Sequence, residues 1–202
     1  MSMNDLVQHI PPHRCDPARP RGCAIWITGL SGSGKSTTAF ADKARLQFER
    51  IACHALDGDN LRHGINRDLD FTLQERAENI RRTAEIAKLS GDAGLLAIVS
   101  LISPLGSDRA MTRGIIGAEA FIEVFMSTPI EVCERCDPKA LYKRDLLGQI
   151  QNITGISSPY QVLTAPDISV SSENATPDEL AAIVVTKVRA TMAAKPSNLI
   201  ST

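Results

Sequence analysis

Four short apolar segments are spaced along the first part of the chain, and each has the length of a single β-strand. They cover residues 23–28, 51–56, 95–102 and 120–126. Within these segments the apolar side chains mostly follow one another instead of alternating with polar ones. Continuous apolar strands are typical of a parallel sheet that is buried on both faces. The pattern therefore predicts a parallel sheet with helices on both sides.

Helical patterns alternate with these strands. Residues 35–50 form the first predicted helix. A second begins at Thr72, which is spaced from Glu75 as in a capping box. Its apolar stripe consists of Leu73, Ala77, Ile80, Ala84 and Ala87. A last helix begins at Thr176, because Pro177 suits the first helical position. The alternation predicts an α/β fold of three layers, with a central parallel sheet flanked by helices.

The chain divides into a terminal arm and one domain. Residues 1–22 are polar and rich in proline, so we expect an arm outside the core. Residues 23–202 have the size of a single domain. Between residues 137 and 166 the hydrophobic pattern weakens, and basic residues, Gly and Pro accumulate. This segment is either a mobile lid or a long surface connection.

Composition narrows the class of protein. Of the 202 residues, 43% are apolar and 22% charged, as in an ordinary globular protein. The formal net charge of −1 argues against a dedicated partner of nucleic acid or of an anionic membrane. No apolar run is long enough to span a membrane, and the chain does not start with a signal pattern. We expect a cytoplasmic protein.

The cysteines fit a reducing compartment. They are odd in number and scattered, at Cys15, Cys23, Cys53, Cys133 and Cys136. This usage does not suggest a disulfide framework. The last two form a C-x-x-C pair, which is compatible with a redox or metal role. The alternative is two small residues that lie near each other on a helix.

A glycine-rich loop joins the first strand to the first helix. The sequence GLSGSGKST fits the pattern G-x-x-x-x-G-K-[ST]. In this pattern backbone N–H groups and the helix N-terminus surround a polyphosphate. The lysine reaches the β- and γ-phosphates, and the hydroxyl after it ligates Mg²⁺. The loop therefore predicts a site for a nucleoside triphosphate with magnesium. Its residues are Gly29, Leu30, Ser31, Gly32, Ser33, Gly34, Lys35, Ser36 and Thr37.

Two carboxylates follow the second predicted strand, in the sequence DGDNLRHGIN. Since parallel strands end at one edge of the sheet, Asp57 and Asp59 are expected to face the phosphate loop. There they would support hydrated Mg²⁺ and accept a proton from an attacking hydroxyl. The alternative is a turn with a helix cap.

Cationic groups are expected next to these carboxylates. Arg62 follows them closely, and Arg76 and Asn79 share one face of the helix that begins after Thr72. A cation in the first helical turn, such as Arg76, opposes the helix dipole. An anionic acceptor bound beside the arginines would resolve this conflict. The alternative is a surface pairing of Arg76 with Glu75 or Glu78.

Taken together, several motifs resemble those of the adenylyl-sulfate kinase family. They are GLSGSGKSTT, DGDNLRHGIN, ERAENIRR and ISP, followed by EVCER, DPKALYK and TGI. The likeness extends from about residue 4 to residue 170. It implies a P-loop kinase fold with a lid. It also implies transfer of the γ-phosphoryl of MgATP to the 3′-hydroxyl of adenylyl sulfate, which gives 3′-phosphoadenylyl sulfate in sulfate activation. The family suggests a homodimer and is compatible with functional pairing with an ATP sulfurylase.

The resemblance also implies roles for individual residues. Lys35, Asp57 and Asp59 would be catalytic, with Ser36 and Asp59 at the Mg²⁺, partly through water. The acceptor site would consist of Arg62, Phe71, Arg76, Asn79, Ile102, Ser103 and Lys139, with Phe71 stacked on the adenine. Lys139 and Lys143 fall in the lid of the family. The serine at Ser103 has been proposed there as a transient phosphate carrier. Direct in-line transfer is preferred here, because Ser103-Pro104 is equally explained as a strand-ending turn.

The sequence departs from the family pattern on the acceptor and lid side. Ile153 replaces a stacking Phe, and Leu146 replaces a lid Arg beside Asp145. Leu105-Gly106 stands in place of Tyr-Arg, and Asp70 in place of Gly. Because each change removes a cation, an aromatic face or a small residue, we expect weakened affinity for the acceptor or a somewhat different acceptor.

Two other functions remain open from the sequence. One is a related small-molecule kinase that acts on a sugar acid or a nucleoside monophosphate. The other is a weakly active or non-catalytic nucleotide-binding paralogue. The intact phosphate loop and the two carboxylates speak against the second, whereas the losses on the lid side speak for it.

Overall fold

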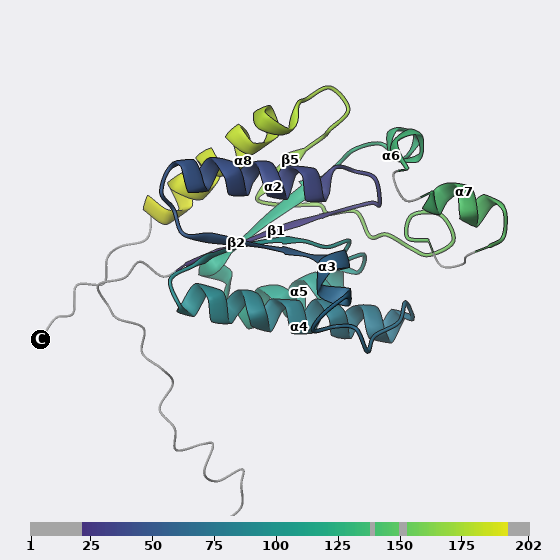
Figure 1. The fold of residues 1–202 in the computed structure, drawn as a ribbon, viewed down its shortest axis with the longest axis horizontal. Coiled ribbons are helices and arrows are strands. Elements are labelled where there is room, and N and C mark those ends of the chain that lie inside the picture. The colour runs from purple at the N-terminus through teal and green to yellow at the C-terminus, as the bar shows by residue number, and fades with distance from the viewer. Residues whose placement is uncertain (1–21, 138–139, 150–152, 194–202) are drawn as a thin grey trace, which may run out of the picture.

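Five parallel strands form the centre of the molecule (Figure 1). The computed structural model describes residues 22–137, 140–149 and 153–193. The strands are β1 (Ala24–Gly29), β2 (Cys53–Asp57), β3 (Leu96–Ser100), β4 (Phe121–Met126) and β5 (Ile168–Val170), in the order β2-β3-β1-β4-β5. The four predicted strands and their parallel arrangement are confirmed. The short strand β5 at the edge was not predicted.

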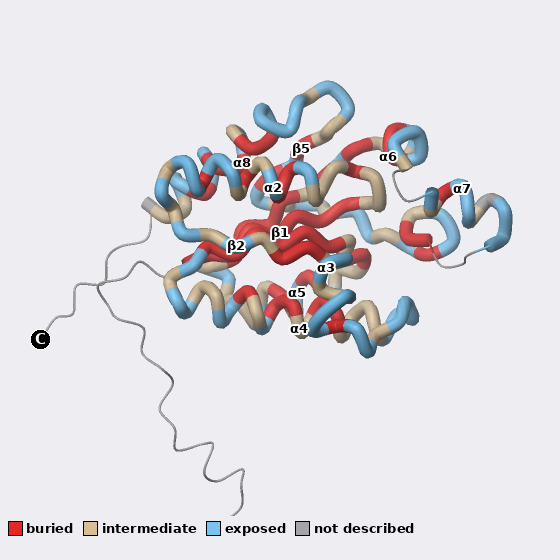
Figure 2. The backbone as a smooth tube through the Cα atoms, viewed as in Figure 1, coloured by how far each residue is buried: buried red, intermediate tan, exposed pale blue. Residues whose placement is uncertain are grey.

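Helices cover both faces of this sheet, as the sequence pattern predicts. One face is covered by α2 (Lys35–Phe48) and α8 (Pro177–Ala193), and the other by α4 (Leu73–Asp92) and α5 (Gly106–Ile116) (Figure 1). The three central strands β1, β3 and β4 are almost wholly buried, whereas the edge strands β2 and β5 are partly exposed (Figure 2). The described part of the chain is therefore a three-layer α/β fold with one apolar cluster on each face of the sheet.

The helix ends follow from local sequence. The Thr72 hydroxyl accepts a hydrogen bond from the backbone N–H of Glu75 at 3.2 Å, and the Thr176 hydroxyl caps α8 in the same way. By contrast, α2 begins directly after Gly34 without a side-chain cap. Uncapped N–H groups at a helix N-terminus are suited to an anion. The sequence of the glycine loop thus leaves the start of α2 open toward a ligand.

Shorter elements connect these layers. They are α3 (Gly58–Arg62), the 3-10 helix η1 (Ala118–Ala120), α6 (Ile130–Cys136) and α7 (Leu141–Leu146). Cys133 and Cys136 both lie on α6. This is the position expected from the alternative interpretation, in which they are two small residues near each other on a helix. Among the described residues there is no group of three or more His, Cys, Asp and Glu side chains that could hold a metal ion. None of the described helices has the length and apolarity needed to cross a membrane.

The segment with the weak hydrophobic pattern packs on the phosphate loop. Figure 1 shows α7 beside the sheet edge at which the strands end. The buried Tyr142 of α7 donates a hydrogen bond to the Ser31 carbonyl at 2.9 Å, and its ring packs with Cys133 and Ile153. Leu30 of the loop borders this cluster. Helix α7 is thus attached to the phosphate loop by one hydrogen bond and by apolar contacts.

Candidate active site

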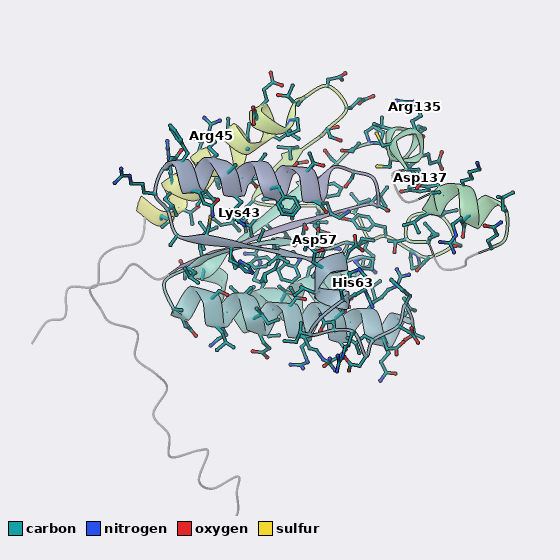
Figure 3. All side chains as sticks on the ribbon, in the orientation of Figure 1. Lys43, Arg45, Asp57, His63, Arg135 and Asp137 are labelled. Atoms are coloured by element: carbon teal, nitrogen blue, oxygen red, sulfur yellow. The ribbon has the colours of Figure 1, made fainter. Side chains whose placement is uncertain are left out.

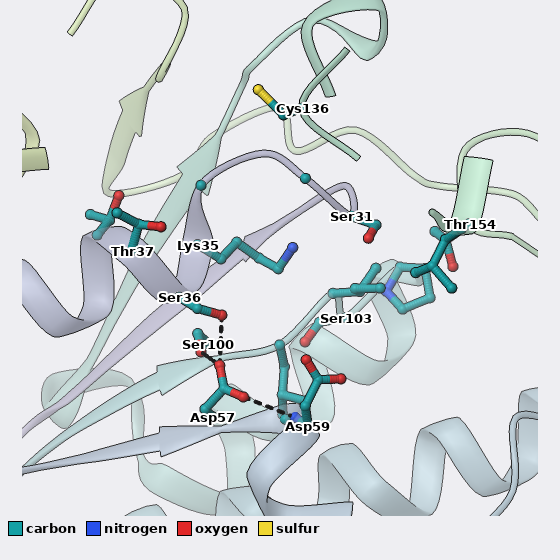
Figure 4. Close-up of a pocket in the computed structure, with 18 of the residues that line it drawn as sticks. Ser31, Lys35, Ser36, Thr37, Asp57, Asp59, Ser100, Ser103, Cys136 and Thr154 are labelled. Atoms are coloured by element: carbon teal, nitrogen blue, oxygen red, sulfur yellow. Dashed lines mark hydrogen bonds between the residues drawn. The ribbon is translucent and has the colours of Figure 1, made fainter. Parts of the chain in front are cut away.

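A cavity of about 910 Å³ lies at the edge where the parallel strands end. The phosphate loop and the start of α2 form one wall, with Ser31, Lys35 and Ser36. The ends of β2 and β3 form the floor, with Asp57 and Ser103 among the lining residues (Figure 4). The carboxylates and the glycine loop therefore share one cavity, as the parallel topology predicts.

The phosphate loop has the backbone that its glycines permit. Gly32 and Gly34 have φ values of 73° and 90°, which a residue with a side chain rarely adopts. A Cβ on Gly32 would also lie 2.7 Å from the Cys133 carbonyl oxygen of α6. The Lys35 ammonium donates to the Leu30 carbonyl at 2.6 Å, across the loop. The lysine is thus drawn over the turn in which phosphates would bind.

Asp57 connects the phosphate loop to two neighbouring strands. Its Oδ2 accepts hydrogen bonds from the Ser36 hydroxyl at 2.6 Å and the Ser100 hydroxyl at 2.8 Å. Its Oδ1 accepts from the backbone N–H of Asp59 at 3.1 Å and caps α3. Figure 3 shows Asp57 at the end of β2, between the helical layers. Asp57 thus caps helix α3, as the alternative interpretation predicts, and also contacts the phosphate loop.

Asp59 stands at the start of α3 and lines the cavity. Its side chain is exposed, whereas that of Asp57 is buried. Figure 4 shows the two carboxylates side by side below Ser36 and Lys35. The buried carboxylate therefore lies against the Ser36 hydroxyl of the loop, and the exposed one lines the cavity.

Two guanidinium groups flank the ring of Phe71. The Arg62 guanidinium lies 4.3 Å from the ring centroid and that of Arg76 lies 5.9 Å from it. Burial lowers the pKa of both arginines, although a guanidinium stays charged throughout the working pH range. The ring itself is 61% exposed. An aromatic ring and two cations thus lie together on one side of the cavity.

Backbone and side-chain contacts hold these arginines in place. Arg62 donates to the carbonyls of Leu69 and Asp70 at 2.9 and 3.0 Å, and Arg76 donates to Thr154 at 2.7 Å. The alternative interpretation pairs Arg76 with Glu75 or Glu78 at the surface, but both of these acids have other partners. Glu78 accepts hydrogen bonds from Arg81 and Arg82, and Glu75 accepts one from Thr72.

Asn79 lines the cavity from α4 and is held by a residue that the sequence analysis did not single out. Its Oδ1 accepts a hydrogen bond from Asn66 Nδ2 at 2.7 Å. Both amides are buried, with exposed fractions of 4% and 0%. Asn66 ends the motif DGDNLRHGIN, but nothing in its spacing indicates the contact, because Asn79 comes from the next helix.

The loop after β3 lines the cavity with Ile102, Ser103 and Pro104. Ser103 has a φ of 43° and is almost fully buried, and its hydroxyl accepts a hydrogen bond from Trp26 Nε1 at 2.9 Å. This fits the strand-ending turn that the sequence predicts. Among the other predicted lid and acceptor residues, Ile153 lines the cavity and packs with Tyr142. Lys139 lies outside the described residues.

The chain is similar to known proteins in both sequence and fold. The family model described as Adenylylsulphate kinase matches residues 21–171. Adenylyl-sulfate kinase 1, chloroplastic, of Arabidopsis thaliana is 51% identical over 166 residues, which are 82% of this chain and 60% of that protein. Adenylyl-sulfate kinase of Marinobacter nauticus is 50% identical over 157 residues, 78% of this chain and 79% of that protein. The bifunctional enzyme NodQ of Rhizobium tropici is 48% identical over 171 residues, 85% of this chain but 27% of that protein.

The length covered thus differs among the relatives, since the chain spans only 60% of the plant protein and about a quarter of NodQ. Among solved structures, APS kinase CysC of Mycobacterium tuberculosis, in complex with AMPPNP and APS, has a TM-score of 0.81 and 46% identity. That match covers 84% of this chain and 99% of the other. A sugar kinase from Janibacter, at 18% identity and a TM-score of 0.59, shares the fold. The chain therefore belongs to the adenylylsulphate kinase family.

Proposed function

We propose that the chain transfers the γ-phosphoryl group of ATP to the 3′-hydroxyl of adenylyl sulfate. The observation that carries the proposal is one cavity that holds the phosphate loop, two carboxylates and the arginine-flanked Phe71. A triphosphate site alone would suit many kinases, whereas an aromatic face between two cations suits a purine nucleotide with an anionic tail. The kinship with a protein solved with AMPPNP and APS supports this pairing of substrates.

The donor side follows from the loop. Backbone N–H groups and the start of α2 would surround the β- and γ-phosphates of ATP, and the Lys35 ammonium would neutralise charge that develops between them. Because Lys35 already reaches across the loop to the Leu30 carbonyl, it needs little rearrangement to contact the phosphates. The contact would be stronger in the transition state, which is the condition for rate acceleration.

The residues around Ser36 fit a magnesium ion. Mg²⁺ prefers oxygen ligands and is held in such sites by one or two protein groups together with phosphate oxygens and water. The Ser36 hydroxyl, only 2.6 Å from the Asp57 carboxylate, supplies such groups, and Asp59 lies beside them. When bound, the ion would neutralise charge on the phosphates. We therefore assign Ser36 and Asp57 to its immediate surroundings and Asp59 to its hydration shell.

The 3′-hydroxyl of the acceptor would lie near Asp59. Phe71 would stack on the adenine, while Arg62 and Arg76 would pair with the phosphosulfate. Asp59 is the exposed one of the two carboxylates and lines the cavity, so we assign it as the proton acceptor. In the reaction the 3′-oxygen would form a bond to the γ-phosphorus of ATP. The bond between the γ-phosphorus and the oxygen bridging to the β-phosphate would break, and the hydroxyl proton would pass to Asp59. ADP and 3′-phosphoadenylyl sulfate leave.

Release of ADP in the presence of a panel of acceptors tests the proposal. With MgATP present, adenylyl sulfate should trigger turnover, whereas AMP and a sugar acid such as gluconate should not. Lys35→Ala should abolish turnover, and Lys43→Ala, farther along the same helix and outside the cavity lining, should leave it unchanged. Turnover with gluconate or AMP in place of adenylyl sulfate would indicate a different kinase. Absence of turnover with every acceptor would indicate a nucleotide-binding protein without this activity.

A further inference from the structure

A buried arginine lies behind the loop that lines the acceptor side. Arg109 belongs to α5, is only 8% exposed, and is not among the described residues that line the cavity. No motif in the sequence draws attention to it. Long cationic side chains are rarely buried unless their donors are fully used. The contacts of Arg109 therefore indicate why it is there.

The guanidinium joins two segments that are far apart in the sequence. Its Nη1 donates to the Ser103 carbonyl at 2.8 Å, and its Nη2 donates to the Gln161 carbonyl at 2.8 Å. Ser103 belongs to the loop after β3, whereas Gln161 lies in the segment that returns from α7. A planar guanidinium donates from separate nitrogens in a rigid fork, whereas an ammonium group donates from one nitrogen whose hydrogens rotate. Arg109 thus fixes the spacing of the two segments.

Gln161 completes the connection from the other side. Its backbone N–H donates to the Pro104 carbonyl at 2.9 Å, and its side-chain Oε1 accepts from the Gly106 N–H at 2.6 Å. The loop of residues 102–106 is therefore bonded to Gln161 directly and through Arg109. We call Arg109 and Gln161 the loop clamp.

The loop needs such a clamp because its backbone is unfavourable. Ser103 has a φ of 43°, in the left-handed region that residues with a Cβ rarely adopt. A conformation of this kind persists only where surrounding contacts hold it. Arg109 holds the carbonyl of Ser103, and Trp26 holds its hydroxyl at 2.9 Å. Ile102, Ser103 and Pro104 in turn form part of the cavity wall.

Acidic neighbours keep the buried cation neutralised. Arg109 Nε lies 3.8 Å from Glu123, which also lies 3.6 Å from Arg113, and Arg113 lies 3.3 Å from Asp167. The charges of the four side chains sum to zero. Arg113 has the same carboxylate as a partner, but it also contacts Asp167 and the ring of Phe121 instead of the clamp. It is therefore a matched control within one helix.

We infer that Arg109 is a positioning residue for the acceptor: it holds residues 102–104 in the shape that adenylyl sulfate requires, and it couples that loop to the segment returning from α7. The inference rests on the proposed function for the identity of the acceptor. Arg109 acts through backbone carbonyls and does not touch the reacting atoms. Its loss should therefore weaken acceptor binding while leaving the phosphate loop and ATP binding intact.

Arg109→Lys tests the inference, because lysine keeps the charge beside Glu123 but cannot bridge two carbonyls in the same geometry. We expect the KM for adenylyl sulfate to rise about tenfold, as for loss of one charge-assisted hydrogen bond, with the KM for MgATP unchanged. Arg113→Lys should change neither value. A KM for adenylyl sulfate equal to that of the unsubstituted protein would overturn the inference, as would an equal rise in both KM values.

Hydrogen exchange separates this result from a failure of the proposed function. In Arg109→Lys, amide exchange should speed up in residues 101–107 and 159–163 but not in the phosphate loop, and not in Arg113→Lys. This readout needs no activity. If the unsubstituted protein does not turn over adenylyl sulfate but exchange changes as stated, the proposed function is wrong and the clamp remains. Unchanged exchange in both segments would refute the clamp itself.

Discussion

At the scale of single residues, the site depends on side chains that have two structural roles. Asp57 caps α3 and also accepts the Ser36 hydroxyl from the phosphate loop. Ser100 donates to the same carboxylate from β3. One carboxylate thus joins three elements and holds the glycine loop next to the ends of β2 and β3.

Asp59 gives the sharpest prediction for a single residue. Because its exposed carboxylate is assigned to the 3′-hydroxyl proton, Asp59→Asn should lower kcat by roughly 10²–10⁴-fold, the usual contribution of a general base. The KM for MgATP should change much less than kcat, because Asp59 is assigned only to the hydration shell of the ion and the phosphate loop is unaltered. Steady-state kinetics measure both values. Asp68→Asn is the control, because Asp68 pairs with Arg82 on the surface, and full activity in Asp59→Asn would remove Asp59 from its role.

Ile153 tests whether the acceptor side is weakened. It lines the cavity but offers an aliphatic side chain where the family pattern has an aromatic ring. A stacking face contributes about 1 kcal/mol, or about fivefold in affinity. Ile153→Phe should therefore lower the KM for adenylyl sulfate about fivefold without changing that for MgATP. An unchanged or higher acceptor KM, with the thermal midpoint preserved, would show that no stacking face is missing there.

At the scale of elements, helix α2 buries a carboxylate, that of Asp42, whose charged form is unfavourable in the protein interior. Asp42 is fully buried among the described residues, and neither of its carboxylate oxygens has a hydrogen-bond partner there. Burial raises the pKa of this carboxyl to about 8. The folded protein therefore keeps a proton that the unfolded chain releases from about pH 4 upward. Stability from this group is present at low pH and is lost as the pH rises toward 8.

Asp42→Asn should remove that dependence. Between pH 5 and pH 8, the unsubstituted protein should lose roughly 3–4 kcal/mol of unfolding free energy relative to Asp42→Asn. Urea denaturation at the two pH values measures the difference. Asp92→Asn, at the exposed end of α4, should show no comparable change. Equal pH profiles for Asp42→Asn and the unsubstituted protein would mean that Asp42 is ionised and solvated in the fold.

The elements also show what a sequence pattern can and cannot predict. The long helices α4 and α8 were found from their capping boxes, and four strands from continuous apolar runs. Helix α5 was missed because it starts at Gly106 without a side-chain cap and its buried residues are polar, whereas its apolar residues Met111, Ile115 and Ile116 are only partly buried. Strand β5 has three residues, one of them exposed, so it offers no pattern to detect.

The same limit applies to the site. The phosphate loop and Asp57 were predictable because a motif and the edge rule of parallel sheets locate them. Asn66 and Arg109 were not predictable, because their partners come from other elements. The Asn66–Asn79 contact spans 13 residues of sequence, and the Arg109–Gln161 contact spans 52. Long-range contacts between polar groups leave no local signature, so only the structure reveals them.

At the scale of the whole molecule, the fold brings the phosphate loop and the two carboxylates to the same end of the parallel strands. The strand order β2-β3-β1-β4-β5 sets β3 between β1, which leads into the phosphate loop, and β2, which leads to Asp57 and Asp59. The arginines at the acceptor side supply local positive charge although the chain has a net charge of −1. The proposed reaction requires this arrangement, because donor phosphate and acceptor hydroxyl must meet in line.

The most direct test of the account is the position of the transferred phosphate. The protein should be incubated with MgATP and adenylyl sulfate, and the products followed by phosphorus NMR. A new phosphomonoester signal coupled to the ribose 3′-hydrogen, with one ADP formed for each, is the predicted result. Formation of ADP with inorganic phosphate alone, or a phosphate attached at another position, would contradict the account.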